Sequence, residues 1–447
     1  MSSHGKQNPS CPCLYHTSKR QHVYRIRKWR THMKHTNYDL VVIGAGPAGM
    51  SAAIQAAMNG AKVAIIDENP IPGGKLLGQL YKDPKSNEWW IGKDIAKMMD
   101  EKIKQLPITC FQESEVWGIF PHWKVNLNTG EELSTKNILL ATGAAEKAIP
   151  IPGWTKPGAM AIGAAQTLAN YHRVKPGNKV AIIGIDPLSL TVAHELKLAG
   201  IHVIGIFQPP ASKFSHEKSN PKQTISYLST LAHLAPNPWL KGFAKMAKQP
   251  FIQTLSTHLP FGINVQGVPL YFRKTILEIE GEQQVEQIKI ANLSPNGSIK
   301  RTANKTIKVD CVCISGGLYP LTELATLVGC KMAYMKELGG HIPLHNAEME
   351  TTEKGIFVAG NITGIESAKV AIAQGKLAGT AISGRMGLLK NVKPAIQKAQ
   401  KQLRLTRNDS LFHFHPQIEQ GRKKVQQLWD QNFPAKEESD QWKQQMP

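Results

Sequence analysis

The sequence has few cysteines and no long apolar run, and each shortage narrows the class of protein. Six cysteines in 447 residues are too few for a disulfide scaffold and favour a reducing compartment. No run of about 18 apolar residues occurs, so we expect no transmembrane span. Hydrophobic residues still make up 41% of the chain, which excludes a disordered or fibrous protein and predicts sizeable cores.

Acidic residues are scarce, with 33 Asp and Glu against 54 Lys and Arg, and the net charge is +21. A protein this basic is a candidate to bind nucleic acid, an anionic membrane surface or an acidic substrate. Residues 1–37 carry eight of the cations and no acid, so the rest of the chain carries 21 − 8 = +13. We interpret residues 1–37 as a disordered basic extension and expect no nucleic-acid partner. The alternatives are a transit peptide, a nucleic-acid arm, or translation that starts at Met33.

The cysteines form no metal-binding or redox pattern. Cys11 and Cys13 have no second cysteine pair at ligand spacing, so we expect no metal site. Cys311 and Cys313 alternate within a predicted buried strand, 309–314, where thiols pack as small hydrophobic groups. No Ser, His and Asp constellation stands out, and the sequence identifies no catalytic side chain.

A glycine-rich turn is the strongest motif in the chain. The apolar run 40–43 predicts a buried parallel strand, and Gly44, Gly46 and Gly49 follow it in a Gly-x-Gly-x-x-Gly pattern. The first glycine suits a tight turn, and the second lets backbone approach a pyrophosphate. The third allows close packing of the helix that we expect over 50–59.

A second apolar run, 63–66, ends at Asp67, which is 67 − 44 = 23 residues past the first glycine. That spacing suits a carboxylate that accepts hydrogen bonds from a ribose. A lone glycine pattern is weak evidence of function. Strand, glycine turn, helix, strand and terminal acid together predict a dinucleotide-binding site.

A second doubly wound domain is expected from about Pro176, but its glycine pattern is incomplete. Its first predicted strand, 179–183, runs into Gly184, and Asp186 occupies the position where backbone would approach a pyrophosphate. A carboxylate there repels phosphates, and Phe207 stands where an acid would hold a ribose. The sequence leaves NAD(P) binding open and favours a structural half-site or a site for another nucleotide.

Three further segments accompany the first fingerprint: Pro-Gly-Gly-Lys at 72–75, a strand into Ala-Thr-Gly at 137–143, and a strand into Ala-Gly-Asn at 355–361. Together they resemble the two-dinucleotide-binding-domain flavoproteins of the pyridine nucleotide-disulfide oxidoreductase type. Other segments are similar to one branch, the flavoprotein subunits of hydrogen cyanide synthase and opine oxidase and the alpha subunit of dye-linked L-proline dehydrogenase. These segments are 67–70, 152–158, 315–318, 322–324 and 360–364.

The resemblance implies an α/β fold in which an FAD-binding Rossmann-like domain carries an inserted, degenerate second Rossmann-like domain. FAD is the implied cofactor. Most relatives have Asp at the position of Asn361, whose amide can still bond a ribityl hydroxyl but carries no charge. The implied cofactor contacts are Gly44, Gly46, Pro47, Ala48, Gly49, Asp67, Glu68, Gly74, Lys75, Val116, Ala141, Thr142, Gly143, Gly360, Asn361 and Ala368.

We expect the chain to divide into five parts. They are the extension 1–37, the first part of the FAD-binding domain at 38–160, the second nucleotide-binding-like domain at 161–310 with a helical insertion near 208–262, the second part of the FAD-binding domain at 311–389, and a helical C-terminal arm at 390–447.

The resemblance also implies a function. It indicates an FAD-dependent oxidoreductase that serves as the electron-transfer flavoprotein subunit of an amine or amino-acid dehydrogenase or oxidase complex. Its partners would be a second flavoprotein subunit, an electron acceptor and a small amine or amino acid, in the cytoplasm or peripheral to the membrane. The alternatives are a stand-alone NAD(P)H-dependent FAD oxidoreductase and a flavin-fold protein that binds nucleic acid or a partner without turnover.

Overall fold

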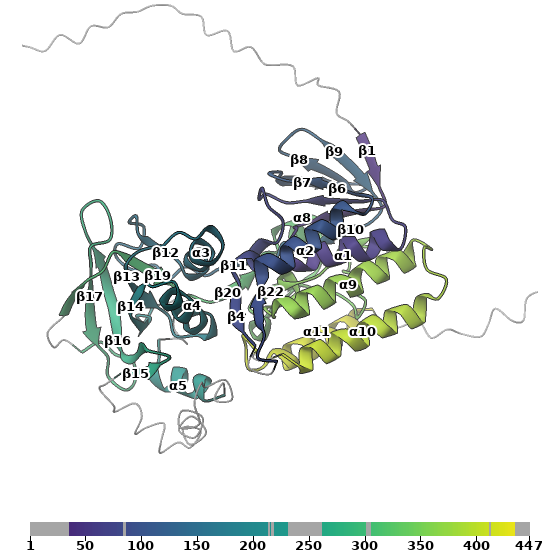
Figure 1. Ribbon diagram of the computed structural model, residues 1–447. Coiled ribbons are helices and arrows are strands. Elements are labelled where there is room, and N and C mark those ends of the chain that lie inside the picture. Colours follow the sequence, from purple (N-terminus) through teal and green to yellow (C-terminus); the bar gives the residue numbers. More distant parts are fainter. Residues whose placement is uncertain are drawn as a thin grey trace, which may run out of the picture.

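The computed structural model describes residues 35–433, except 84–85, 213–214, 216–218, 231–261, 301–304 and 411–412. Two lobes are visible, joined by a narrow waist (Figure 1). Three expectations lie outside the described residues wholly or in part: the extension over 1–34, the insertion over 231–261, and the arm over 434–447.

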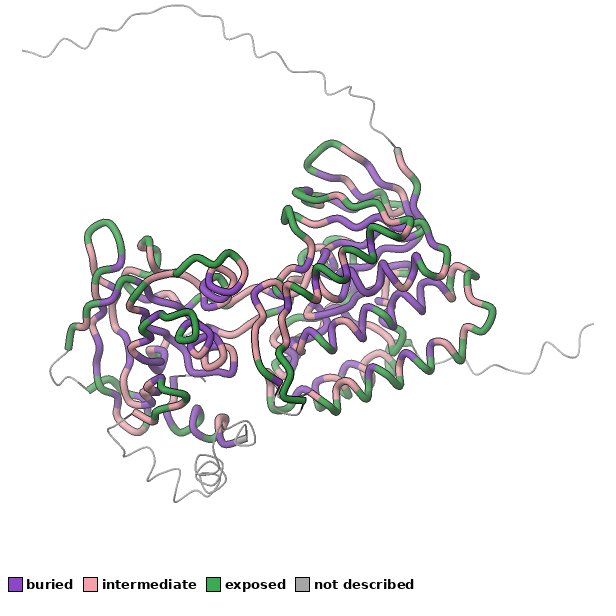
Figure 2. Tube along the Cα trace, viewed as in Figure 1, coloured by how far each residue is buried: buried purple, intermediate pink, exposed green. Residues whose placement is uncertain are grey.

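The first domain is built on a five-stranded parallel sheet with the order β23-β10-β2-β3-β6. Four of its five strands, β2, β3, β10 and β23, are buried along their whole length. Helices cover one face of the sheet and a smaller sheet covers the other, which explains the continuous apolar runs (Figure 2). The strands are β2 (Leu40–Ile43), β3 (Val63–Ile66), β6 (Ile108–Phe111), β10 (Ile138–Leu140) and β23 (Ile356–Val358).

Three helices cover the first face of this sheet. Helix α1 begins at Pro47 rather than at Met50, because proline has no amide hydrogen to lose at the first helical position. Helix α9 continues to Arg385, and apolar residues of α10 cover its C-terminal part. The helices are α1 (Pro47–Met58), α2 (Gly92–Lys104) and α9 (Ala368–Arg385).

The smaller sheet has the order β1-β9-β8-β7, and its first strand corrects the expected boundary of the N-terminal extension. Strand β1 begins at His35, inside the segment 1–37 that we expected to be disordered. It pairs in parallel with β9, which gives the backbone of residues 35–37 hydrogen-bond partners. The strands are β1 (His35–Tyr38), β7 (Val116–Phe120), β8 (Lys124–Leu127) and β9 (Glu132–Thr135).

The second domain has a mixed sheet with the order β12-β19-β13-β14-β16-β17-β18, with β15 paired to β16. Strand β19 corrects the expected end of this domain at residue 310. It pairs in parallel with β12 and β13, so the domain includes Ile314. The strands are β12 (Ala159–Ala161), β13 (Lys179–Ile183), β14 (His202–Gln208), β15 (Ile263–Val265), β16 (Val268–Glu280), β17 (Gln287–Asn292), β18 (Lys305–Lys308) and β19 (Cys311–Ile314).

Helices cover one face of this second sheet, and the long hairpin of β16 and β17 folds over the other. The helices are α3 (Ile162–Thr167), α4 (Pro187–Leu198) and α5 (Pro221–Thr230), and the chain makes another helical turn over Leu168–His172. Helix α5 is the described part of the expected helical insertion.

The chain passes twice between the two lobes, through an antiparallel pair of short strands, β11 (Ala144–Glu146) and β20 (Leu318–Pro320). Near this waist lie the helical turn η1 (Gly74–Gly78) and the hairpin of β4 (Leu80–Lys82) and β5 (Trp89–Ile91). A short helix, α8 (Glu323–Leu327), and a hairpin of β21 (Met332–Met335) and β22 (Gly340–Pro343) follow β20 in the first domain.

The region expected to form a C-terminal arm contains two helices that pack along the first domain (Figure 1). Helix α10 (Val392–Asn408) places Ile396, Ala399 and Leu403 in the same core cluster as α9. Helix α11 (Ile418–Asn432) buries Ile418 and Val425 against the residues around β22. These helices therefore belong to the body of the first domain.

Candidate functional site

A cavity of about 1670 Å³ opens at the carboxyl ends of β2, β3 and β10 and continues across the waist to the second domain. Carboxyl ends of parallel strands are where α/β proteins place ligands. All of the sequence-predicted cofactor residues except Gly49 line this one cavity. The second domain contributes mostly apolar side chains, among them Leu188, Leu190, Ile225, Leu228 and Phe272.

The glycine turn has the three local geometries that its sequence predicts. Gly44 has a φ of +103°, and a Cβ atom there would lie 2.4 Å from the carbonyl oxygen of Ala141. A Cβ atom on Gly49 would lie 1.9 Å from the carbonyl oxygen of Gly44, which explains why Gly49 does not reach the cavity. Around Gly46, no atom lies within 4 Å of the Cβ position. The turn is therefore packed on both sides and open in the middle.

Helix α1 begins at that open position with amide groups directed toward the cavity. No side chain caps its first turn, because the N-cap residue is Gly46. Uncapped amides and the positive end of the helix dipole favour an anionic group. Gly74 packs above the turn, with its Cβ position 3.4 Å from the Cα atom of Gly46. The backbone of two segments thus surrounds a space suited to a pyrophosphate.

Asp67 holds the glycine turn in place. Its Oδ2 atom accepts a hydrogen bond of 2.6 Å from the amide of Ala45, and its Oδ1 atom accepts one of 2.8 Å from the amide of Asn69. The exposed Glu68 follows it and lines the same cavity. The ribose contact of Asp67 stays a prediction, and the structure shows that Asp67 orders the turn.

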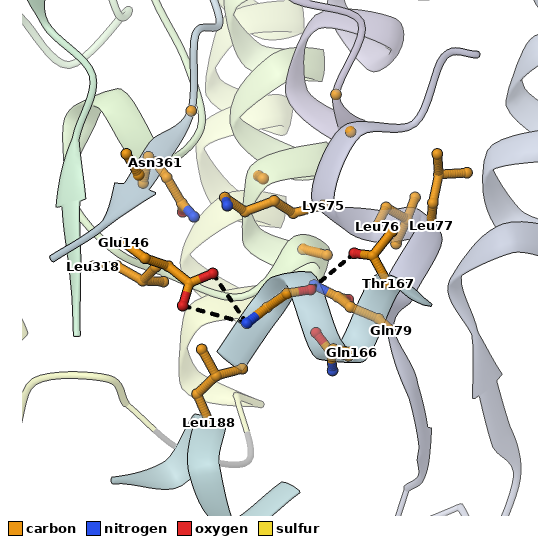
Figure 3. Close-up of a pocket in the computed structure, with 18 of the residues that line it drawn as sticks. Lys75, Leu76, Leu77, Gln79, Glu146, Gln166, Thr167, Leu188, Leu318 and Asn361 are labelled. Carbon is orange, nitrogen blue, oxygen red and sulfur yellow. Dashed lines mark hydrogen bonds between the residues drawn. The ribbon is translucent and has the colours of Figure 1, made fainter. Parts of the chain in front are cut away.

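Further along the cavity, Lys75 and Asn361 extend toward one another, and the Glu146 carboxylate lies across from them (Figure 3). Glu146 accepts hydrogen bonds of 3.0 and 3.3 Å from the amide of Gly163. Burial raises the pKa of Glu146, while that backbone hydrogen bond and Lys75 lower it. Glu146 was not predicted from the sequence, although an acid three residues after the Ala-Thr-Gly turn was a usable signal.

The buried carboxylate of Glu195 connects the two lobes through hydrogen bonds. Glu195 of α4 accepts hydrogen bonds from Gln166 at 3.0 Å and from Asn170 at 2.7 Å, and also from the backbone amide of Leu80. Asn170 in turn donates to the carbonyl oxygen of Gly78, at 2.8 Å. Burial raises the pKa of Glu195 to about 8. No sequence pattern indicated this network, because an acid on a helix usually faces water.

A residue between α10 and α11 also reaches the cavity and contacts the second domain. Phe414 lines the cavity, and its carbonyl oxygen accepts a hydrogen bond of 3.1 Å from the hydroxyl of Tyr227 in α5. Thr142, which also lines the cavity, donates to the carbonyl oxygen of Leu321 at 2.6 Å. Segments from both lobes and from the C-terminal helices therefore enclose one space.

In the second glycine turn, the side chain of Asp186 fills the position that is open at Gly46 in the first turn. Asp186 is the N-cap of α4, and its Oδ1 atom accepts a hydrogen bond of 2.9 Å from the amide of Ser189. Its Oδ2 atom accepts one of 2.8 Å from the hydroxyl of Ser315. Asp186 and Ser189 also form a capping box. A resident carboxylate therefore takes the Ser189 amide, at the helix start where a phosphate would bind.

We expect Asp186→Ala to lower the free energy of unfolding by about 1–2 kcal/mol, because the helix loses its cap and Ser315 loses its acceptor. Urea unfolding of the full chain measures this loss. Asp186→Asn is the matched control, since asparagine caps a helix about as well as aspartate. Equal stability of the alanine variant and the natural protein would contradict this role.

The described residues contain no group of three His, Cys, Asp or Glu side chains arranged to hold a metal ion. Cys311 and Cys313 are buried in β19, with their Sγ atoms 3.8 Å apart, and neither lines the cavity. The hydrogen bond between Cys311 and Cys313 and burial both raise the pKa of the Cys313 thiol, which opposes thiolate chemistry. Among the helices of the described chain, none is long and apolar enough to cross a membrane.

The fold and the glycine-lined cavity define a nucleotide-binding oxidoreductase of the two-domain type, and comparison with known proteins identifies the family. The sequence model of the pyridine nucleotide-disulphide oxidoreductase family matches residues 38–375. The chain belongs to this family, which confirms the predicted fold class and implies FAD as the cofactor.

Particular relatives are named as subunits of enzymes. An opine oxidase subunit of Agrobacterium tumefaciens is 28% identical over 77% of this chain and 65% of the relative. Hydrogen cyanide synthase subunit HcnB of Pseudomonas protegens is 26% identical over 80% of this chain and 73% of the relative. The chain thus spans just under two thirds of that opine oxidase relative.

A solved structure shares the fold. L-proline dehydrogenase from P. horikoshii superimposes with a TM-score of 0.58 at 20% identity, over 83% of this chain and 60% of that one. The cavity residues also fit the implied cofactor. Gly46 leaves open space, the first turn of α1 is uncapped, and the cavity of about 1670 Å³ is large enough for a dinucleotide.

Proposed function

We propose that the chain is the FAD-bearing subunit of an amine or amino-acid dehydrogenase or oxidase complex, and that it exchanges electrons with an acceptor and a partner subunit. The observation that carries this proposal is the contrast between the two glycine turns. The turn at Gly46 is open, whereas Asp186 fills the corresponding position of the second domain. The similarity to oxidase subunits supports the choice of donor class.

Bound FAD would supply hydride and electron transfer, and the side chains of this chain would hold and orient it. The turn at Gly46 and the start of α1 would bind the pyrophosphate, with Asp67 and Glu68 beside the ribose. Asn361 would donate to a hydroxyl of the ribityl chain. Glu146, which the amide of Gly163 holds in place, would face Lys75 across the cavity.

A stand-alone NAD(P)H-dependent oxidoreductase is the second candidate. Gly184 keeps the tight turn of a second fingerprint, with a φ of +102°, and the family as a whole is named for pyridine nucleotides. Two features oppose this candidate. Asp186 occupies the phosphate position, and the buried Phe207 replaces a ribose-binding acid.

Anaerobic rapid mixing of the purified, FAD-loaded chain with NADH or NADPH tests the proposal. We expect the flavin absorbance to remain unbleached on the time scale of turnover, because the second domain lacks a free phosphate site. A thioredoxin reductase mixed with NADPH is the positive control. Rapid bleaching by NADH or NADPH would establish the second candidate instead.

The complex purified from native cells tests the donor class. We expect an amine or amino acid, such as L-proline or an opine, to bleach the flavin only when the partner subunit is present. Full activity of the isolated chain as a monomer would contradict the proposed place in a complex.

A further inference from the structure

Glu366 forms an ion cluster with both C-terminal helices. Its Oε1 and Oε2 atoms accept hydrogen bonds of 3.1 and 2.9 Å from Arg407 of α10. Arg422 of α11 donates to Oε1, and Gln374 donates to Oε2 at 3.1 Å. The Glu366 side chain is 8% exposed, against 21% and 19% for the two arginines. The cluster is thus largely shielded from water.

Glu366 connects the cluster to the wall of the cavity. Glu366, the N-cap residue Ser367 and Ala368 at the start of α9 all line it. The amide of Glu366 donates a hydrogen bond of 3.1 Å to Oδ1 of Asn361, another lining residue. The charges of the C-terminal helices are therefore coupled to the wall of the cavity through direct contacts.

The cluster carries a net positive charge. Two guanidinium groups and one carboxylate give 2 − 1 = +1. His345 lies close by, and burial lowers its pKa to about 4, so it stays neutral near pH 7. Glu419 also acts on Arg422 but is exposed, and water screens its charge. The positive end of the α9 dipole adds to the excess positive charge.

We propose that Arg407 and Arg422, held by Glu366, are positioning residues that raise the reduction potential of a flavin bound in the cavity. This inference rests on the proposed function, because it requires FAD in that cavity. On reduction the flavin ring takes up two electrons and one proton and gains one negative charge. A net positive cluster at the start of α9 stabilises that charge, and the potential rises.

Reductive titration of the full FAD-loaded chain with dithionite and a reference dye measures the potential. Arg407→Gln and Arg422→Gln each reduce the cluster to zero net charge. We expect the equilibrium constant for flavin reduction to fall by roughly tenfold in each variant. A tenfold change in a two-electron equilibrium equals about 30 mV. Glu366→Gln raises the cluster charge to +2 and should shift the potential in the opposite direction.

Two controls separate charge from packing. Arg407→Lys keeps the charge and should leave the potential within a threefold change in the equilibrium, about 14 mV. Arg385→Gln removes a similar ion pair, with Glu350, at the far end of the 18-residue α9 and should change nothing. If Glu366→Gln does not fold, the two Arg→Gln variants are compared with Arg407→Lys. The inference then requires that the reduction potentials of the Arg→Gln variants fall below that of Arg407→Lys.

Potentials that fail to move, or that move in the same direction for arginine and glutamate variants, would overturn the inference while the bound flavin still supports the proposed function. A chain that binds no FAD overturns the proposed function and this inference together. Lowered potentials of both Arg→Gln variants, with Arg385→Gln unchanged and Arg407→Lys within a threefold change, support the electrostatic role, and a raised potential of a folded Glu366→Gln supports it further.

Discussion

The Gly46→Val variant will fold but will bind FAD more weakly. The backbone at Gly46 is extended, with φ −72° and ψ −179°, a conformation that valine adopts readily, and no atom lies within 4 Å of its Cβ position. The added methyl groups occupy the space where a pyrophosphate would approach the amides of α1. Overpacking of that kind costs about 1–3 kcal/mol, so we expect FAD affinity to fall by roughly 5- to 150-fold.

Titration of the apoprotein with FAD, followed by flavin fluorescence, measures this loss, and thermal unfolding of the apoprotein checks the fold. Gly49→Ala is the matched comparison. Its new Cβ atom would lie 1.9 Å from the Gly44 carbonyl oxygen, so that variant should lose stability even without FAD. Undiminished FAD affinity of Gly46→Val would exclude this turn as the pyrophosphate site.

At alkaline pH the Glu195→Gln variant will be more stable than the natural protein by several kcal/mol. Burial raises the pKa of Glu195 from 4.5 to about 8, so the folded state binds a proton that the unfolded state releases between these values. The contribution of Glu195 to the free energy of unfolding is fully present below about pH 4.5 and is lost as the pH rises toward 8. A shift of that size corresponds to roughly 3–5 kcal/mol. Glutamine stays neutral and avoids the loss.

Urea unfolding at pH values between about 4 and 9, in steps of roughly one unit, measures the difference across the titration range of this glutamate. The exposed Glu348→Gln is the control, and its pH profile should follow that of the natural protein. A Glu195→Gln profile that runs parallel to the natural protein at every pH would show that Glu195 is ionised in the folded state.

The sequence predicted the elements whose signals are local. The strand at 40–43, the glycine turn and the strand at 63–66 were all recognisable, because backbone geometry restricts those positions to apolar residues and glycine. The degenerate character of the second turn was also visible, since a carboxylate stands at Asp186. Only the structure shows that this carboxylate caps α4.

The charged groups around the cavity could not be found in this way. Glu195 and Glu366 look like ordinary surface acids in the sequence, and their partners are distant along the chain. Arg422 lies 422 − 366 = 56 residues beyond Glu366, and the Leu80 amide lies 195 − 80 = 115 residues before Glu195. Pairings over such separations depend on tertiary packing and leave no pattern that periodicity can reveal.

The double passage of the chain through β11 and β20 has a consequence for protein synthesis. Strand β23 pairs with β10, although 356 − 138 = 218 residues separate their first positions. The entire second domain lies between them, so the ribosome completes it while the central sheet of the first domain still lacks its last strand. We therefore expect the second domain to fold first during translation. The first domain then exposes the edge of β10 until residue 358 has emerged from the ribosome.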